Sequence, residues 1–138
     1  KKLNLRVVIA PHPKTKIKDK SELFGYRRVI SGKTNDLIIH SSLIITRNSS
    51  AVAFACYYKK PIILFYTNET QNTLAQKSTD SLSKSLGLKA VNLNNYQKFN
   101  FNKLTKFEKK KYENYLNKYC TFKNINIPNY KIWDKTIF

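Results

Sequence analysis

The sequence predicts an α/β fold: a parallel sheet with helices on both faces, followed by a C-terminal helical arm. Three observations predict it. Apolar stretches of strand length alternate with helical stretches along the first two thirds of the chain. One of these strands, Ile62–Tyr66, has only apolar or aromatic side chains, which is typical of a strand buried on both faces. A Lys-rich helical stretch at 104–119 then replaces the alternation.

The first third of the chain begins with a predicted strand at 5–10. Its sequence, LRVVIA, is rich in β-branched side chains, and Pro11 and Pro13 then impose a rigid loop. Three further elements are expected before residue 42: a turn or helical start at 21–25, a strand at 28–30, and a helix at 35–40 with Thr34 as its N-cap.

The middle of the chain reads as strand, polar turn, helix and strand. A buried strand is expected at 43–46 and a helix at 49–58. This helix carries small apolar side chains nearly all round, so it is expected to be buried against the sheet. Pro61 ends it, because proline disfavours helical backbone in the residue before it, and the strand Ile62–Tyr66 follows.

The last part of the chain predicts two more helices and a short strand. A helix at 73–86 should end at Gly87, and a strand should follow at 90–93. We expect one helix over 104–119, with Leu104, Phe107, Lys111, Tyr115 and Leu116 near one face. Apolar residues of the tail, Ile127, Tyr130, Ile132 and Trp133, are expected to pack on a surface. Residues 1–97 are therefore interpreted as the α/β domain and residues 98–138 as a helix and tail that pack on it.

The chain is strongly basic. Among its 138 residues, 26 Lys and Arg stand against 8 Asp and Glu, which gives a net charge of +18. Such a surface attracts phosphates, nucleic acids and anionic membranes. Abundant Asn and Lys with few Gly also suit an AT-rich genome, so the charge alone does not select a partner.

Two other classes of function find little support in the composition. Cys56 and Cys120 are interpreted as unpaired thiols, and no Cys/His pattern predicts a metal site or another cofactor. No apolar run reaches the length of a membrane span, and no secretory signal is visible. The chain begins at Lys1 without Met, so we expect a fragment of a longer cytoplasmic protein.

Two polar loops are predicted to follow parallel strands at their carboxyl ends, where doubly wound sheets bind ligands. The first holds His12, Pro13 and Lys14, and its imidazole can donate a hydrogen bond to a phosphate oxygen. The second is Arg47-Asn48-Ser49-Ser50, where hydroxyls and backbone N–H groups can receive a phosphate. Ordinary alternatives are a structural turn with a solvated histidine and a serine helix cap. We expect both loops at one edge of the sheet, where they favour phosphate binding.

Other motifs are less informative. Ser31-Gly32-Lys33-Thr34 resembles the end of a phosphate loop, but Arg27 occupies the position of the first glycine, so a P-loop is rejected. His12 and His40 have no evident nucleophile, and no acidic pair compels an acid–base interpretation. Catalytic residues are therefore unknown and expected outside this chain.

The order VVIAPHPK, then TNDLIIHSSLIITRNSSAVAFACYYKKPIILF, resembles the C-terminal, Rossmann-like half of GT-B glycosyltransferases. The likeness is to bacterial surface-polysaccharide enzymes, such as sialyltransferases, polysialyltransferases and Kdo transferases. Their HP and serine motifs, which bind a donor nucleotide that is often CMP, match His12-Pro13 and Ser49-Ser50. The resemblance implies a nucleotide-sugar donor, a glycan or lipid-linked acceptor, and a separate N-terminal domain that carries the catalytic base.

Two positions depart from the resemblance. Phe54 stands where many such domains have a Glu that contacts the donor ribose, which fits CMP-sugar families better than UDP-sugar families. Lys59-Lys60-Pro61 lacks the usual Gly before Lys-Pro.

The sequence thus predicts the donor-binding domain of a glycosyltransferase that makes capsule or other surface polysaccharide. Its basic faces would seat it peripherally on the anionic inner membrane. The alternatives are a nucleic-acid-binding module, suggested by the charge and nine tyrosines, and a sugar epimerase of the same fold. Nucleic acid is disfavoured because the basic residues of 104–119 are mixed with apolar core positions.

Overall fold

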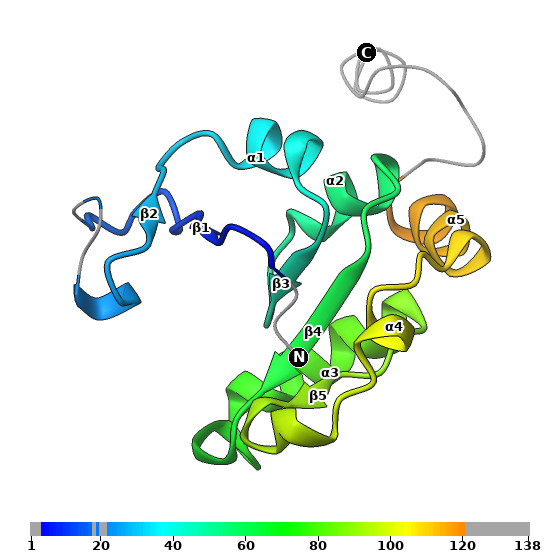
Figure 1. Ribbon diagram of the computed structural model, residues 1–138. Helices are drawn as coiled ribbons and strands as arrows, with labels where there is room; N and C mark the ends of the chain where they lie inside the picture. Colours follow the sequence, from blue (N-terminus) through cyan, green and yellow to red (C-terminus); the bar gives the residue numbers. More distant parts are fainter. Residues whose placement is uncertain (1–3, 18, 20–21, 121–138) are drawn as a thin grey trace, which may run out of the picture. The chain divides into compact units, whose positions relative to one another are not determined.

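The computed structural model describes residues 4–17, 19 and 22–120 and contains helices and small parallel sheets, which confirms the α/β class. The chain gathers into two compact units, Lys1–Ser42 and Leu43–Phe138. Figure 1 labels their helices and strands.

The first unit holds a two-stranded parallel sheet and one α-helix. Its elements are β1 (Val8–Ile9), the 3₁₀ helix η1 (Glu22–Phe24), β2 (Arg28–Val29) and α1 (Thr34–His40). The predicted strands and helix are thus confirmed, with shorter strands than expected. The cap of α1 was predicted wrongly: Lys33 is the N-cap residue and makes no side-chain capping bond, while Thr34 is already helical.

The pairing of β1 with β2 is supported by a neighbouring loop. Ile9 lies opposite Val29, and the carbonyl oxygen of Ile9 accepts a hydrogen bond of 2.9 Å from the Ile30 N–H. The N–H of Val29 donates to the Asp19 carboxylate at 2.7 Å. A backbone donor of a two-residue strand is therefore satisfied by a side chain, as buried polar groups require.

The second unit is built on a three-stranded parallel sheet with the order β3-β4-β5 (Figure 1). Its elements are β3 (Ile44–Thr46), α2 (Val52–Tyr57), β4 (Ile62–Tyr66), η2 (Asn68–Thr70), α3 (Leu74–Leu86), β5 (Val91–Asn92), η3 (Leu93–Lys98), α4 (Phe101–Leu104) and α5 (Lys109–Tyr119). The predicted positions of β4 and α3 are confirmed, and Gly87 ends α3 at φ +64° as expected of a left-handed C-cap.

The core of the second unit lies between β4 and three helices. Ile62, Ile63 and Leu64 of β4 are buried, and α2, α3 and α5 contribute the other buried side chains. The chain passes from β3 to β4 through α2 and from β4 to β5 through α3, in the same direction across the sheet. Because such connections between parallel strands are right-handed, α2 and α3 lie on the same face of the sheet. Contacts of α5 with both helices agree with this single helical layer.

The described strands form a two-stranded sheet in the first unit and a three-stranded sheet in the second. A single sheet that joins them stays a prediction. On the face that carries Ile63, the neighbouring Ile45 of β3 is 57% exposed. Helices on both faces of one sheet therefore stay a prediction.

The expectation of one helix over 104–119 is wrong. A break at residues 105–108 separates α4, which has Thr105 as its C-cap, from α5. The new helix presents Tyr112, which was not predicted, as its buried residue at 2% exposure, with the Phe107 ring edge-on at 5.2 Å. The predicted division at 97/98 stays a prediction, and the tail residues from 121 on lie outside the described part of the chain.

Candidate functional site

The loop that follows β1 contains the first group of predicted site residues. Pro11 is buried, whereas His12, Pro13 and Lys14 are exposed. The turn closes where the Thr15 N–H donates to the His12 carbonyl oxygen at 2.8 Å. The buried proline fixes the loop to its unit, and the next three residues face solvent.

The imidazole of His12 has a defined orientation. The backbone N–H of Lys14 donates to His12 Nδ1 at 3.2 Å. In a neutral imidazole, a ring nitrogen that accepts a hydrogen bond carries no proton, so the proton is on Nε2. His12 therefore offers Nε2–H as a donor on an exposed loop. His40, by contrast, ends α1 at the surface, as expected, with Nδ1 2.8 Å from the Asp36 carbonyl oxygen.

The turn that follows β3 contains the second group of predicted residues. The side chain of Asn48 donates from Nδ2 to Ser78 Oγ of α3 at 2.9 Å. This bond ties the turn to a helix that begins 26 residues later and leaves Asn48 Oδ1 as an acceptor. Arg47 is exposed and carries the only formal charge of the motif.

Ser49 and Ser50 have different roles at the start of α2. Ser49 Oγ accepts from the Ala51 N–H at 3.2 Å, so this serine does act as a local cap, the ordinary alternative. The Ser50 side chain is exposed and makes no hydrogen bond to the described residues. Regular helix begins only at Val52, three residues later than expected, and the intervening turn is closed by 3.2 Å bonds to the Ser49 and Ser50 carbonyl oxygens.

The two positions that depart from the resemblance are also visible. Phe54, on α2, is 48% exposed, so this position faces solvent in spite of its apolar side chain. Lys59 has φ +55°, a left-handed conformation that glycine adopts most readily. Lysine at this position therefore occupies a backbone shape that suits the Gly of the resemblance.

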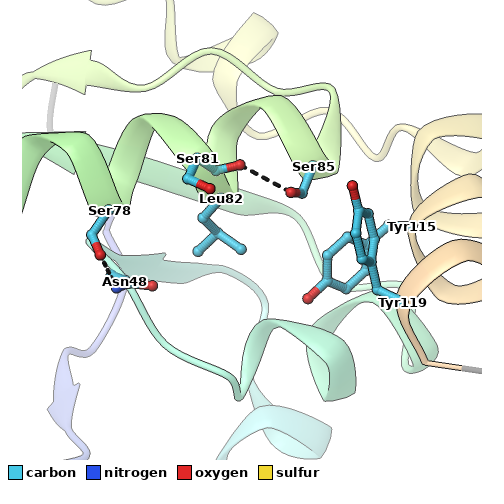
Figure 2. Close-up of a pocket in the computed structure, with 7 residues that line it drawn as sticks. All are labelled: Asn48, Ser78, Ser81, Leu82, Ser85, Tyr115 and Tyr119. Atoms are coloured by element: carbon cyan, nitrogen blue, oxygen red, sulfur yellow. Dashed lines mark hydrogen bonds between the residues drawn. The ribbon is translucent and has the colours of Figure 1, made fainter.

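A shallow groove of about 260 Å³ lies beside Asn48 in the second unit (Figure 2). It is lined by uncharged residues of the turn, α3 and α5: Asn48, Ser78, Ser81, Leu82, Ser85, Tyr115 and Tyr119. Of these residues, only Asn48 was predicted from sequence as part of a binding site. The spacing of the serines at 78, 81 and 85 was the sequence signal that could have predicted the groove. Residues three, four or seven positions apart lie on the same face of a helix.

Burial modifies one phenol of the groove. The pKa of Tyr115 is raised, first by burial and then by the nearby Cys120 thiol. This side chain is therefore a neutral hydroxyl at physiological pH. A neutral hydroxyl can both donate and accept a hydrogen bond.

In the part of the chain that the structure describes, no three acidic, His or Cys side chains cluster where they could hold a metal ion. None of the described helices combines the length and apolarity that crossing a bilayer requires.

The predicted site residues fall into the two units. His12, Pro13 and Lys14 belong to the first, and Arg47 to Ser50 belong to the second. The structure gives the geometry of each loop separately, so their joint contact with one phosphate stays a prediction. Comparisons of this chain with protein-family models, curated proteins and solved structures found no match.

Proposed function

We propose that this chain is the nucleotide-sugar-binding domain of a bacterial surface-polysaccharide glycosyltransferase, with a Rossmann-like fold that forms half of a GT-B enzyme. The observation that carries the proposal is the orientation of His12. Its Nδ1 accepts from the Lys14 N–H, so its exposed Nε2–H is available to donate to a phosphate oxygen. Each candidate loop also follows the carboxyl end of a parallel strand, the usual place for a ligand in such sheets.

The proposed mechanism is electrostatic. Transfer of a sugar from its nucleotide leaves negative charge on the departing phosphate, and donors aimed at that charge lower the barrier. His12 Nε2–H and the Ser50 hydroxyl would be these donors. Lys14 and Arg47, both exposed, would add positive charge. The base that activates the acceptor is assigned to a domain outside this chain.

The end of α2 supports the resemblance at a position where the sequences differ. Lys60 N–H donates to the Ala55 carbonyl oxygen at 2.8 Å and Lys59 N–H to the Cys56 carbonyl oxygen at 3.1 Å. These two bonds are the Schellman arrangement, whose central residue is usually Gly. The backbone that the family's glycine would favour is therefore present here, with Lys59 in the glycine position.

The charge of the chain suggests where the acceptor is met. A net charge of +18 would attract an anionic membrane surface at a gain of roughly 1 kcal/mol per nearby basic residue. A lipid-linked glycan acceptor would be held at the same surface. We therefore propose peripheral association with the cytoplasmic face of the inner membrane.

Calorimetric titration with CMP tests the role of His12. A hydrogen bond to a charged group is worth about 1.5 to 3 kcal/mol, so His12→Ala should weaken CMP binding by roughly 10-fold to 100-fold. His40→Ala is the matched control, because it removes the other histidine of the same unit and should leave the affinity unchanged. Equal CMP affinity in the wild-type chain and His12→Ala would contradict the assignment.

A titration with a single-stranded oligonucleotide separates the main alternative. Tight binding that weakens steeply with salt, in a chain that binds no CMP, would favour a nucleic-acid-binding module. We expect the reverse pattern. A titration with UDP compares the two nucleotides. We expect CMP to bind more tightly than UDP, because the solvent-facing Phe54 stands where UDP-sugar families have a ribose-binding Glu.

A further inference from the structure

The groove beside Asn48 owes its existence to small side chains on α3. Serines at 78, 81 and 85 share one face of this helix, which faces Tyr115 and Tyr119 of α5 across the groove (Figure 2). The two helices meet beyond the end of α3, where a side-chain Cβ at Gly87 would lie 3.5 Å from carbons of Lys111. Serines leave a space that larger apolar residues would fill, and Leu82 lies along this space between Asn48 and the tyrosines.

The polar groups of the groove include both donors and acceptors. Asn48 Nδ2 donates to Ser78 Oγ at 2.9 Å, which leaves Asn48 Oδ1 as an acceptor and the Ser78 O–H as a donor. The Ser85 hydroxyl donates to the Ser81 carbonyl oxygen at 3.0 Å, and the Ser85 side chain also hydrogen-bonds to Tyr119, which lowers the pKa of that phenol, so the polar groups open to a ligand are those of Asn48 and Ser78. A ligand that matches this mixture must itself donate and accept.

The groove is unsuited to a phosphate. None of its lining residues is charged, although a quarter of the chain's residues are. Phosphate oxygens only accept, and they are usually met by Arg or Lys side chains. The Lys118 ammonium is positioned over the Tyr119 ring, 5.3 Å from its centroid, in a cation–π contact. The candidate loops at His12 and Ser50, with their basic neighbours, differ from the groove in this respect.

The tyrosines add an aromatic surface of limited size. The rings of Tyr115 and Tyr119 have centroids 5.3 Å apart and planes tilted by 41°. A pyranose ring presents C–H groups that pack on such a surface and hydroxyls that both donate and accept. The groove, at about 260 Å³, lies below the roughly 300 to 1,000 Å³ of sites for drug-sized ligands, so it suits a single ring.

We propose that the groove between α3 and α5 binds one uncharged sugar unit of a glycan, with the tyrosines as its platform and Asn48 and Ser78 as its polar contacts. This site goes beyond nucleotide binding, because it recognises hydroxyls and C–H surface rather than phosphate. A chain with such a site would hold a saccharide even in the absence of a nucleotide.

Saturation-transfer NMR on the whole chain tests the proposal, with methyl β-D-glucopyranoside and methyl β-D-galactopyranoside as probes. Transfer to the pyranose C–H protons is expected for at least one probe. Loss of one aromatic platform in Tyr119→Ala should weaken that binding by about tenfold. Tyr57→Ala is the matched control, because Tyr57 is 68% exposed on α2 and does not line the groove, whereas Tyr119 is 51% exposed.

CMP titration of the same variants separates this proposal from the previous one. Tyr119→Ala should retain the wild-type CMP affinity, and His12→Ala should retain glycoside binding. Absence of saturation transfer to both glycosides would overturn the sugar site even if CMP binds normally. Equal loss of glycoside binding in Tyr119→Ala and Tyr57→Ala would overturn it as well, since the effect would then not belong to the groove.

Discussion

His12 and Asn48 are each oriented by one specific hydrogen bond. Lys14 N–H fixes the acceptor nitrogen of His12, and Ser78 Oγ fixes the donor end of Asn48. In both cases the bond uses one polar atom and leaves the other for a ligand. The Cys56 thiol, in contrast, is buried and does not face solvent. Its side chain is 2% exposed, and this burial raises the pKa of the thiol from 9.0 to about 12.

The buried thiol predicts a loss of stability at alkaline pH. The unfolded chain loses the Cys56 proton near pH 9, whereas the folded chain keeps it until about pH 12. The folded state therefore binds more protons in this window, and the free energy of unfolding falls as pH rises, by at most about 1.4 kcal/mol per pH unit for this group. Urea unfolding between pH 8 and 11 measures it.

Cys56→Ala is the comparison for this prediction. The variant should lose less stability over the same pH range. The loss that remains comes from Tyr112, whose pKa is also raised, mainly by burial. Cys120→Ala removes the exposed thiol and should follow the wild-type slope more closely. Identical slopes in Cys56→Ala and the wild-type chain would show that the Cys56 thiol ionises at its ordinary pKa.

Two helices of the second unit end in the same way with different residues. At the end of α3, Leu88 N–H donates to the Ser83 carbonyl oxygen at 3.0 Å, and Gly87 has φ +64°. At the end of α2, Lys60 N–H donates to the Ala55 carbonyl oxygen, and Lys59 has φ +55°. A left-handed backbone costs a residue with a side chain roughly 1 to 2 kcal/mol, so α2 ends under strain that α3 avoids.

Lys59→Gly should therefore stabilise the protein. Relief of the left-handed strain outweighs the greater flexibility of glycine in the unfolded chain, for a net gain of about 0.5 to 1 kcal/mol. Thermal and urea unfolding measure the change. Lys60→Gly removes the same charge at a neighbouring residue without positive φ, and it should be neutral or destabilising. A loss of stability in Lys59→Gly would contradict the strain.

Sequence patterns predicted elements best where one local cause decides the structure. Ile62–Tyr66 is apolar throughout, and Gly87 is a strong helix terminator, so β4 and α3 were placed correctly. The C-terminal segment was predicted as one helix, but it forms α4 and α5, which are separated at residues 105–108. Tyr112 is the buried residue of α5, and it shares a face with the predicted Tyr115 and Leu116, which are half-buried.

The candidate site was predictable by residue type but not by contact. Pro11 and Pro13 marked the His12 loop, and position after a strand marked Asn48-Ser49-Ser50. The Asn48–Ser78 bond joins residues 30 positions apart, and local patterns do not contain such pairings. The groove depends on packing between α3 and α5, which only the three-dimensional structure gives.

At the scale of the whole molecule, the chain consists of two units with their own parallel sheets. Each unit carries one of the two phosphate-binding loops predicted from sequence. The net charge of +18 adds long-range attraction for an anionic donor to both units. The central claim is the proposal that the His12 loop donates to a nucleotide phosphate.

The most direct test is a titration of the ¹⁵N-labelled chain with CMP, followed by amide chemical shifts. We expect the amide of Lys14 to shift along a saturation curve with CMP, and the Kd of that curve to rise in His12→Ala. Absence of a shift at Lys14, or the same Kd in the wild-type chain and His12→Ala, would contradict the claim.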